Sequence, residues 1–412
     1  MSSDSSGKTA ALKPAAIKTA VENWLGHIRA LAEGIGPRGS ATDDERRGAE
    51  YSADMLRKLG IAPVTETFPS SGSVFRPHLA ASLGMLVAFL LFPLARPWTA
   101  YAAAGLAALV TVSEICELAL RDNPLRWVLP KRVSRNVHAV LAPAGEARRD
   151  VVLIGHLDTQ RTPIIFSTQR WLDAYQILST IAFVAFIYQT VLIGLGAFLR
   201  AGWIWPASWG ALPFVLLLLL LTLHAESTPY TKGANDNATA VGILLVLGEA
   251  LKAAPLKRTR VWLVCTGSEE ALHEGARHFF STHKHELTDA RAISFELLGC
   301  AGPSWLEREG IVTPLYPDPG LRKLAEKIAR EHPHLEAYPS RISGGVTEAS
   351  DAINAGVPAI TLIGMDRMNH APYWHQEADT ADKMRPEILA KAYEFAWTML
   401  TELDAEAERV NR

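Results

Sequence analysis

Residues 151–159 read VVLIGHLDT, an unbroken apolar run that ends in a histidine and, two positions later, an aspartate. A run without polar alternation predicts a strand that is buried on both faces. Ligands of α/β sheets bind at the carboxyl ends of such strands. His156 and Asp158 are therefore candidate functional residues, with Asp158 placed to orient the His156 imidazole. The alternative is that both residues only cap a turn.

Strand and helix patterns alternate on both sides of this segment. Short apolar runs predict further buried strands at residues 137–141, 261–265, 292–296 and 359–363. Amphipathic or apolar patterns with suitable ends predict helices at residues 40–59, 238–252, 274–283, 321–331 and 386–406. This alternation predicts an α/β fold with a mainly parallel (mixed) central sheet and helices on both faces.

Carboxylates and a second histidine stand at the loops of this pattern. The polar loop TKGANDNATA contains Asp236, just before a predicted helix, where capping of that helix is the structural alternative. Glu269 and Glu270 follow the strand at 261–265, and adjacent carboxylates repel unless a cation separates their roles.

Two further ligand-type side chains complete the set. Glu296 ends an apolar strand, where an unpaired carboxylate is costly, and His375 lies in the loop YWHQEADT beside candidate partners Asp379 and Thr380. Two imidazoles, two carboxylate ligands, a central Asp236 and a spare acid suit a pair of Zn²⁺ ions.

Two apolar blocks interrupt the α/β pattern and raise the mean hydropathy to +0.09. They form four segments at 79–95, 98–118, 174–199 and 203–223. A bilayer crossing takes about 20 apolar residues, so the second pair is long enough and the first pair is marginal. The alternatives are buried helices of a soluble protein, an apolar lid or a dimer face. We expect two transmembrane hairpins at 77–120 and 166–224, inserted into a discontinuous α/β domain that carries the candidate zinc ligands, at 1–76, 121–165 and 225–412.

Charge and cysteine content indicate which side of the membrane carries the domain. Basic residues flank the blocks on the domain side at Arg76, Arg121, Arg126, Lys131, Arg132, Arg135 and Arg170, against Arg96 and Arg200 in the turns. The polar start MSSDSSGKTAALKP has no secretory pattern, and Cys116, Cys265 and Cys300 form no CxxC pair. We therefore expect a multi-pass membrane protein with a cytoplasmic catalytic domain and the lipid bilayer as a partner.

The balance of 41 basic and 43 acidic residues provides no long-range field for nucleic acid. Nucleic-acid binding is therefore excluded as the main function. The sequence leaves the oligomeric state open.

The order and wording of the motifs resemble the co-catalytic zinc aminopeptidases related to aminopeptidase Y and glutamate carboxypeptidase II. The resemblance covers most of the chain outside the apolar blocks and rests on GPRGSATDDERRGAEYSADMLRKLGI, SRNVHAVLAP, GHLDT, GANDNATA, GSEE, SDAINAGVPAITL and WHQEADTADKM. It implies one zinc ion on His156 and Glu296, a second on Glu270 and His375, and Asp236 as a bridge between the two.

The resemblance also implies the catalytic roles. Glu269 is expected to be the general base that deprotonates the water between the zinc ions and later protonates the leaving amine. Asp158 is expected to orient His156, and Asp236–Asn237 to be joined by a cis peptide. One departure is Glu296, which stands where the family has aspartate. The other is the apolar insertion between His156 and Asp236, which brings both roots of the second hairpin to the zinc site.

These observations predict a membrane-anchored zinc-dependent exopeptidase, most simply an aminopeptidase acting on peptides near the membrane surface. A carboxypeptidase, a dipeptidase and a glutaminyl cyclase remain alternatives on the same scaffold. A catalytically inactive scaffold or receptor is the alternative of another class, although every ligand position carries a competent side chain. Tyr373, Trp374 and His370 are weak candidates for substrate binding, with loop packing as the alternative. Glu348 and Asp351 lie in a glycine-rich loop that is a candidate border of the substrate site, with turn formation as the alternative.

Overall fold

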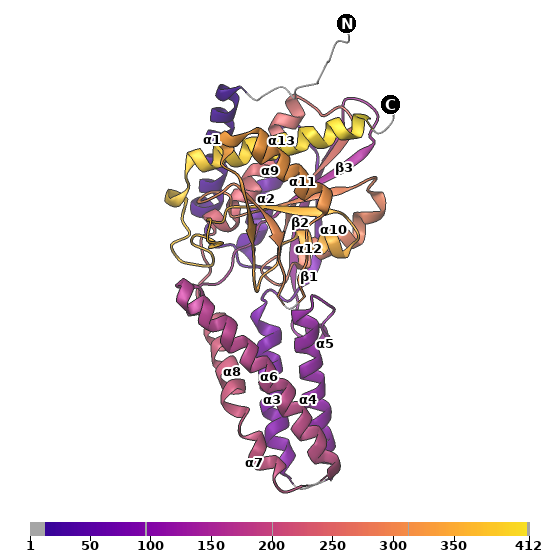
Figure 1. Ribbon diagram of the computed structural model, residues 1–412, viewed down its shortest axis with the longest axis vertical. Helices are drawn as coiled ribbons and strands as arrows, with labels where there is room; N and C mark the ends of the chain where they lie inside the picture. Colours follow the sequence, from indigo (N-terminus) through magenta and orange to yellow (C-terminus); the bar gives the residue numbers. More distant parts are fainter. Residues whose placement is uncertain (1–12, 95–96, 200, 312, 410–412) are drawn as a thin grey trace.

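The chain forms an α/β head and a stalk of long helices in the computed structural model, which describes residues 13–94, 97–199, 201–311 and 313–409 (Figure 1). We call the α/β part the head and the helices at 75–118 and 169–227 the stalk. The first dozen residues, Arg96 and Arg200 entered the sequence analysis but lie outside the described residues.

The head is built on one eight-stranded sheet with the order β1-β2-β4-β3-β5-β8-β6-β7. The strands are β1 (Pro63–Ser70), β2 (Arg132–Leu141), β3 (Arg149–His156), β4 (Thr259–Thr266), β5 (Arg291–Glu296), β6 (Ser304–Arg308), β7 (Tyr338–Arg341) and β8 (Ala359–Ile363). Its centre, β4-β3-β5-β8, is parallel, whereas β1, β2 and β6 join antiparallel neighbours. The mixed sheet and all five predicted strands are confirmed. The short or proline-containing strands β1, β6 and β7 carry no clear buried-strand pattern and were not predicted.

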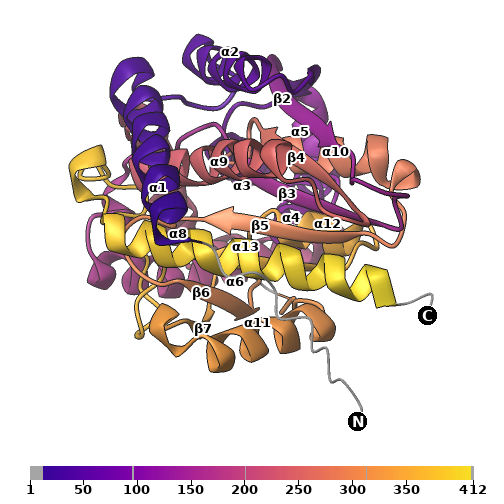
Figure 2. The same cartoon turned by 90° about the horizontal axis from the view of Figure 1, so that it is seen from above.

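Helices cover both faces of the sheet (Figure 2). On β3, Val151 and Leu153 belong to one core cluster and Val152 and Ile154 to another, so the strand is buried on both sides. The first cluster packs under α1 (Pro14–Arg29), α2 (Asp43–Lys58), α9 (Thr239–Ala253), α11 (Pro319–Glu331) and α13 (Pro386–Arg409). The second packs under α10 (Glu274–His283) and α12 (Ala349–Asn354). The predicted α/β architecture is therefore present.

Helix boundaries follow local capping. The Thr42 hydroxyl accepts a hydrogen bond from the Glu45 amide at the start of α2, while Ser40, the other predicted cap, donates instead to Asp158. Gly60 takes a positive φ of 69° just beyond the helix, as expected of a glycine stop. Short turns of helix occur at η1 (Ala30–Ile35), η2 (Phe92–Leu94), η3 (Ile164–Phe166), η4 (Ala234–Ala238), η5 (Lys284–Glu286), η6 (Pro333–Leu335) and η7 (Ala381–Lys383).

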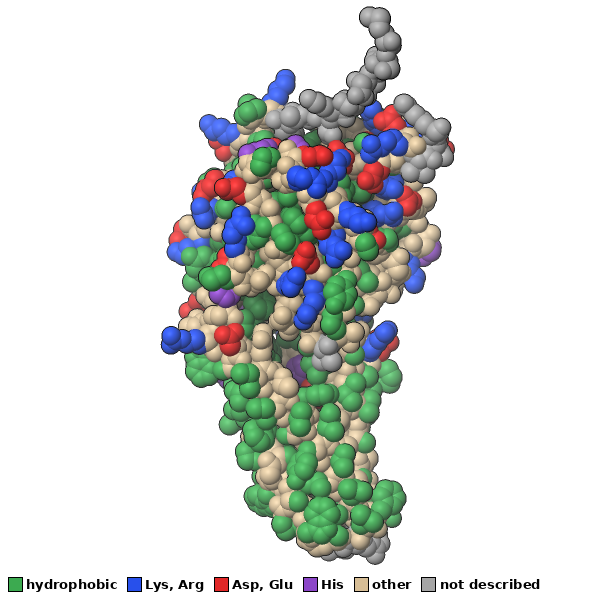
Figure 3. Space-filling view, in the orientation of Figure 1, with side chains coloured by type: hydrophobic (Ala, Val, Ile, Leu, Met, Phe, Trp, Pro, Cys, Tyr) green, Lys and Arg blue, Asp and Glu red, His purple; other side chains and the backbone are tan. Residues whose placement is uncertain are grey.

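The stalk contains α3 (Phe75–Leu91), α4 (Pro97–Leu118), α6 (Gln169–Leu199) and α8 (Leu212–Ser227), with α7 (Ile204–Ser208) at its tip. Four stretches are long and apolar enough to cross a membrane, at 75–94, 98–118, 169–199 and 204–227, with 20, 21, 31 and 24 residues. Large apolar side chains face outward, including Phe198 at 76% and Leu220 at 63% exposure. On the face that Figure 3 shows, the charged side chains lie on the head and at its junction with the stalk, and hydrophobic side chains are spread over the stalk.

A buried arginine ties the stalk to the head. Arg126, in the short helix α5 (Pro124–Val128) after the first hairpin, forms an ion pair with Glu117 of α4. The same guanidinium donates to the Ser71 hydroxyl at 2.6 Å, to Glu274 of α10 at 2.8 Å and to the Ala271 carbonyl at 3.0 Å. The root of the first hairpin therefore contacts the loop that follows β4.

Candidate metal centre

Five candidate ligands converge at the carboxyl edge of the parallel strands. His156 and Glu296 end the neighbouring strands β3 and β5. Asp236 lies in η4 before α9, Glu270 follows β4, and His375 lies in the loop after β8. All five side chains are buried. The sheet thus brings together residues that are up to 219 positions apart, from His156 to His375.

Asp236 stands between the two imidazoles. Its Oδ1 lies 3.3 Å from His156 Nε2 and its Oδ2 lies 3.2 Å from His375 Nε2. Glu296 Oε2 lies 3.5 Å from the His156 nitrogen, and Glu270 Oε2 lies 3.4 Å from the His375 nitrogen. The arrangement is two ligand sets that share one carboxylate.

These separations fit cations better than direct hydrogen bonds. Zinc bonds of about 2.0–2.2 Å in a tetrahedron put neighbouring ligand atoms about 3.3–3.6 Å apart, whereas a good hydrogen bond is about 2.7–3.2 Å. Among the residues that the structure describes, Asp236 Oδ2, Glu270 Oε1 and Glu296 Oε1 are buried without a hydrogen-bond partner. Buried carboxylate oxygens are rarely left so, and a pair of metal ions would satisfy them. The residues present therefore fit two zinc ions.

The pKa values of the buried side chains also indicate that the centre needs positive charge. Burial raises the pKa of Glu270 to about 8 and that of Glu296 to about 7. Burial opposes charge on His375, but the Glu270 and Asp236 carboxylates raise its pKa to about 10. Burial would raise the pKa of Asp236 as well, but the adjacent His156 and His375 imidazoles lower it. Without metal, the site gathers protons to offset its carboxylates, and metal ions would replace those protons.

Glu269 lies at the edge of this ligand set. Its Oε2 is 3.8 Å from His156 Nε2, farther than any of the four distances that define the two ligand sets. Its Oε1 lies 3.1 Å from Nε2 of a buried histidine, His273. The predicted spare acid is therefore beside the centre, with one oxygen turned toward it and one turned away.

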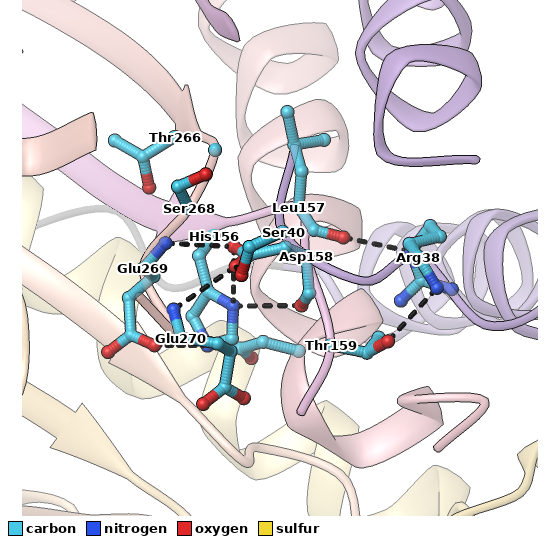
Figure 4. A network of polar contacts seen from close by, with 12 residues as sticks. Arg38, Ser40, His156, Leu157, Asp158, Thr159, Thr266, Ser268, Glu269 and Glu270 are labelled. Carbon is cyan, nitrogen blue, oxygen red and sulfur yellow. Dashed lines mark hydrogen bonds and ion pairs between the residues drawn. The ribbon is translucent and has the colours of Figure 1, made fainter. Parts of the chain in front are cut away.

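Asp158 holds two parts of the centre together (Figure 4). Its carboxylate accepts hydrogen bonds from the Ser40 hydroxyl at 2.6 Å and from the amides of Glu269 and Glu270 at 3.0 and 3.1 Å. The His156 Nδ1 lies 3.0 Å from the Asp158 carbonyl and 3.6 Å from its carboxylate. Asp158 thus contacts the His156 ring mainly through its backbone, and its side chain fixes the loop of the two glutamates.

The backbone at the centre takes uncommon conformations. Ser268, Leu297 and His375 have positive φ values of 51°, 56° and 53°, each at or next to a candidate ligand or the candidate base. Such values cost side chains about 1–3 kcal/mol and cluster at functional sites. The peptide between Asp236 and Asn237 is cis, as the resemblance implied.

Several supporting residues were not identified from the sequence. The fully buried Arg38 donates to the Leu157 and Gly233 carbonyls, at 2.8 and 3.0 Å, and so joins the His156 and Asp236 loops. Asn237 Nδ2 donates to Glu296 at 2.6 Å, and Gln160 Nε2 donates to Glu270 at 2.9 Å. Arginine, asparagine and glutamine are common surface residues, so only their burial distinguishes them.

The two expected partners of His375, Asp379 and Thr380, form hydrogen bonds with other residues in the structure. Asp379 accepts hydrogen bonds from the amides of Asn235 and Asp236 at 2.6 and 3.0 Å and supports the bridging loop instead. Burial raises the pKa of Asp379 to about 7. Thr380 is half-buried and donates to the Ala378 carbonyl and to Asp382. The prediction that these two residues orient His375 is therefore wrong.

Of the three weak substrate candidates, one borders the centre. The Trp374 ring lies 4.5 Å from the His375 ring, centroid to centroid. Tyr373 packs against the main core of the head. His370 is largely at the surface, 3.5 Å from Asp366 Oδ2. Asp351 and Glu348 lie behind the centre, where Glu348 accepts a hydrogen bond from Thr266 and Asp351 contacts His273.

The sequence is similar to known peptidases over part of its length. Residues 217–400 match the profile of Peptidase family M28. Over 183 residues, the chain is 24% identical to Aminopeptidase YwaD of Bacillus subtilis (strain 168). That alignment spans 42% of this chain and 38% of the relative, so the chain corresponds to less than half of that protein.

The fold is similar to solved structures over nearly the whole chain. The zinc aminopeptidase BSAP from Bacillus subtilis is 13% identical, with a TM-score of 0.56 over 93% of this chain and 95% of that one. Porphyromonas gingivalis glutaminyl cyclase is 14% identical, with a TM-score of 0.55 over 93% and 98%. At these identities the likeness shows the fold alone.

The family match and the fold agree with the geometry. The matched region contains Asp236, Glu269, Glu270, Glu296 and His375, and the fold adds His156 from the first half of the chain. The predicted resemblance to the co-catalytic zinc aminopeptidases is confirmed. Residues 217–400 are thus similar to peptidase family M28.

Proposed function

We propose that this chain is a membrane-anchored exopeptidase that uses two zinc ions and removes amino-terminal residues from peptides. The observation that carries the proposal is Asp236, whose two carboxylate oxygens face the Nε2 atoms of His156 and His375 at 3.3 and 3.2 Å. A carboxylate in this position is suited to bridging two cations. His156 and Glu296 would hold one zinc ion, and His375 and Glu270 the other.

When bound, zinc supplies Lewis acidity that polarises a scissile carbonyl and makes water more acidic. The protein residues do the rest. Glu269, with Oε2 turned toward the centre, accepts the proton of the attacking water and then delivers it to the leaving amine. Asp158 keeps that carboxylate in place by binding the Glu269 amide at 3.0 Å. The reaction consumes one water and leaves a new carboxyl group and a new amine.

Several reactions are possible alternatives on this fold, and the products formed from defined peptides distinguish them. Aminopeptidase, carboxypeptidase and dipeptidase action, as well as glutaminyl cyclisation, use the same centre and differ in how the substrate termini are bound. The test is a library of peptides with free or blocked termini, incubated with the zinc-loaded, detergent-solubilised chain. We expect loss of single amino-terminal residues from peptides with a free amine. Cleavage that survives amino-terminal acetylation would contradict aminopeptidase action.

An inactive scaffold is the alternative of another class. Such a protein has no need of a complete centre, yet all five ligand positions and Glu269 carry competent, buried side chains. Zinc content separates the two cases, because a scaffold needs no stoichiometric zinc. A purified chain without zinc, and without peptidase activity after zinc is added, would favour the scaffold.

The long apolar helices support membrane anchoring. Their outward faces carry large apolar side chains, which water solvates poorly and lipid solvates well. Trp127 and Val128 of α5, at the base of the stalk, are 75% and 79% exposed, which suits a residue pair at the membrane–water interface. Recovery of the chain in the alkaline-washed membrane fraction would support anchoring, and recovery in the soluble fraction would contradict it.

The charges around the stalk support a cytoplasmic head. Arg121, Lys131 and Arg132 lie on the head side of the first hairpin, as the positive-inside rule requires of cytoplasmic flanks. Protease treatment of inside-out and right-side-out vesicles tests this orientation. The head should be digested only in inside-out vesicles, and digestion only in right-side-out vesicles would reverse the assignment.

The second hairpin brings apolar groups to the centre itself. Phe166, in η3 at the root of α6, has its ring 4.4 Å from the His375 ring and 5.1 Å from the Trp374 ring. Gln176 of α6 donates to the Ser343 carbonyl of the glycine-rich loop at 3.2 Å. Together these contacts support a mouth that opens beside the membrane surface.

A mouth in this place should favour substrates that are apolar or bound to the membrane. Liposomes containing the protein can be given soluble and lipid-linked peptides with the same terminal sequence. We expect faster cleavage of the lipid-linked peptides at equal bulk concentration. Equal rates for the two peptides would remove the basis for a membrane-facing mouth.

A further inference from the structure

Behind the candidate base lies a buried histidine that the proposed reaction does not use. His273 follows the Glu269–Glu270 pair and precedes α10, and it is 4% exposed. Its Nε2 lies 3.1 Å from Glu269 Oε1 and its Nδ1 lies 2.7 Å from Asp351 Oδ2. One imidazole thus links the base to a carboxylate 78 residues further along the chain.

Both ring nitrogens of His273 face carboxylate oxygens. An imidazole can donate from both nitrogens only in its cationic form. Burial opposes that form, but the charges of Glu269 and Asp351 raise the pKa of His273 well above its usual value. Asp351 is held on its other side, with Oδ1 3.7 Å from Nε of Arg277. The result is a row of alternating charges that ends at Glu269.

The chain adopts a costly backbone to place this ring. Leu272 and His273 have positive φ values of 71° and 54°, a region that favours glycine. Two successive side chains in that region need strong compensating contacts. The flanking residues supply part of the fixation, because Arg126 binds the Ala271 carbonyl and the Glu274 carboxylate.

Glu269 also lies close to candidate metal ligands. One of its carboxylate oxygens and ligand atoms of His156 and Glu270 lie within 4.8 Å of one another, so these three side chains could together hold a metal ion. A carboxylate that binds a metal ion is a weaker proton acceptor. Glu269 is therefore close enough to the centre to become a sixth ligand if nothing holds it back.

We propose that His273, held by Asp351, is a positioning residue that keeps Glu269 a base instead of a metal ligand. The imidazole holds Oε1 away from the centre and leaves Oε2 to accept the proton. This inference rests on the proposed role of Glu269. It assigns no contact with substrate to His273 or to Asp351.

The test compares variants of the full, zinc-loaded chain in detergent. His273→Leu removes both hydrogen bonds, His273→Gln keeps an N–H that can donate to Glu269, and Asp351→Asn weakens the hold on the ring. His283→Leu is the matched control, because His283, the last residue of α10, is also a buried histidine with two carboxylate partners, and these partners, Glu66 and Glu286, lie away from the centre.

We expect His273→Leu to lower kcat by about 100-fold, within the range of general-base effects, with KM changed less than about 3-fold and zinc content unchanged. His273→Gln should recover at least about 10-fold of that loss, and His283→Leu should stay within about 3-fold of the unmodified chain. In a Glu269→Gln background, His273→Leu should have almost no further effect, because the two residues act as a unit.

A second readout does not depend on turnover. In the cobalt-loaded chain, a glutamate that joins the metal ions raises the coordination number and changes the visible absorption. We expect this change in His273→Leu and not in His283→Leu or in the double variant with Glu269→Gln. If no peptide is hydrolysed by the unmodified chain, the proposed function fails and the cobalt spectra still decide the role of His273.

Several results would overturn the positioning role. An unchanged kcat and cobalt spectrum in His273→Leu would do so, as would equal losses in His273→Leu and His283→Leu. A full additional effect of His273→Leu in the Glu269→Gln background would mean that the histidine acts elsewhere.

Discussion

The two halves of the metal centre are built differently. His156 and Glu296 lie on the neighbouring strands β3 and β5, and both are held by the protein: His156 Nδ1 is 3.0 Å from the Asp158 carbonyl, and Glu296 accepts from Asn237 at 2.6 Å. We call this the strand half. His375 and Glu270 lie in loops and form the loop half. Within the described residues, His375 Nδ1 is buried and has no hydrogen-bond partner.

The strand half is therefore the more rigid ligand set, whereas the loop half is connected to the second hairpin. Gln160, which binds Glu270, lies between β3 and η3, and Phe166 of η3 packs on the His375 ring. Ligands with fixed partners lose less freedom on metal binding and bind more tightly. We therefore expect the strand half to bind its zinc ion more tightly and the loop half to respond to substrate and to the stalk.

The largest effect is expected from the residue that both halves share. Asp236→Ala should abolish the binding of both zinc ions and lower activity by about 10⁴-fold or more, since the centre loses its bridge and two imidazoles lose their partner. Elemental analysis of zinc per chain measures this. Asp382→Ala is the control at an exposed aspartate. Retention of two zinc ions in Asp236→Ala would contradict the claim that one carboxylate joins the two halves.

Substitutions of the adjacent residues Glu269 and Glu270 should have different effects, one on kcat and the other on zinc binding. Glu269→Gln should keep both zinc ions and lower kcat by about 10²–10⁴-fold, because the ligands remain and the proton acceptor is lost. Glu270→Gln should instead release the zinc ion of the loop half. Zinc content and kcat measured on both variants check this, and near-normal turnover of Glu269→Gln would mean that the base is misassigned.

Zinc affinity should depend on pH more steeply in the loop half. A ligand must lose its proton to bind metal. Burial raises the pKa of Glu270 to about 8 and that of Glu296 to about 7, so the first carries a proton up to pH 8 and the second only up to pH 7. Affinity should therefore rise from pH 6 to pH 8, by roughly fivefold more in the loop half. Dialysis at each pH followed by zinc analysis tests this, and tighter binding at pH 6 would reverse the sign.

The length of the Glu296 side chain should affect the zinc affinity of the strand half. Glu296→Asp shortens the side chain by one methylene group and draws the carboxylate away from His156 and from its bond with Asn237. We expect zinc affinity of the strand half to fall about 10-fold, with little effect on the loop half. Competition with a chelator measures both affinities. Equal weakening of the two zinc ions would show that the halves are not independent.

The smallest effect is expected at the root of the second hairpin. Phe166→Ala removes the ring that packs on His375 without removing a ligand. We expect KM for apolar peptides to rise by about 3-fold to 10-fold, as for the loss of one apolar contact, and zinc content to stay the same. Phe198→Ala, at an exposed position near the far end of α6, is the matched control. A loss of zinc in Phe166→Ala would mean that the ring supports the ligand and not the substrate.

Much of the strand half could be predicted from the sequence because local patterns encode it. The apolar runs ending at His156 and Glu296 predict strands, and the sheet then puts both side chains at one edge. The edge strand β1 was missed because Pro63–Ser70 contains two prolines and three consecutive polar residues, and so has neither an apolar run nor a regular alternation. The stalk helices were predicted because about 20 apolar residues in a row have few other uses.

What surrounds the centre could not be predicted, because it depends on contacts between distant residues. Nothing near His273 in the sequence indicates Asp351, which lies 78 positions away, and Asp379 resembled a partner of His375 because the two are close in the chain. Arg38 is fully buried only because two loops place their carbonyls around it. Tertiary structure alone determines these roles.

The central claim is that Asp236 bridges two zinc ions. Anomalous diffraction at the zinc absorption edge, from crystals of the zinc-loaded chain, tests it most directly. We predict two peaks, one between Asp236 and His156 and one between Asp236 and His375. A single peak, or none beside Asp236, would contradict the account.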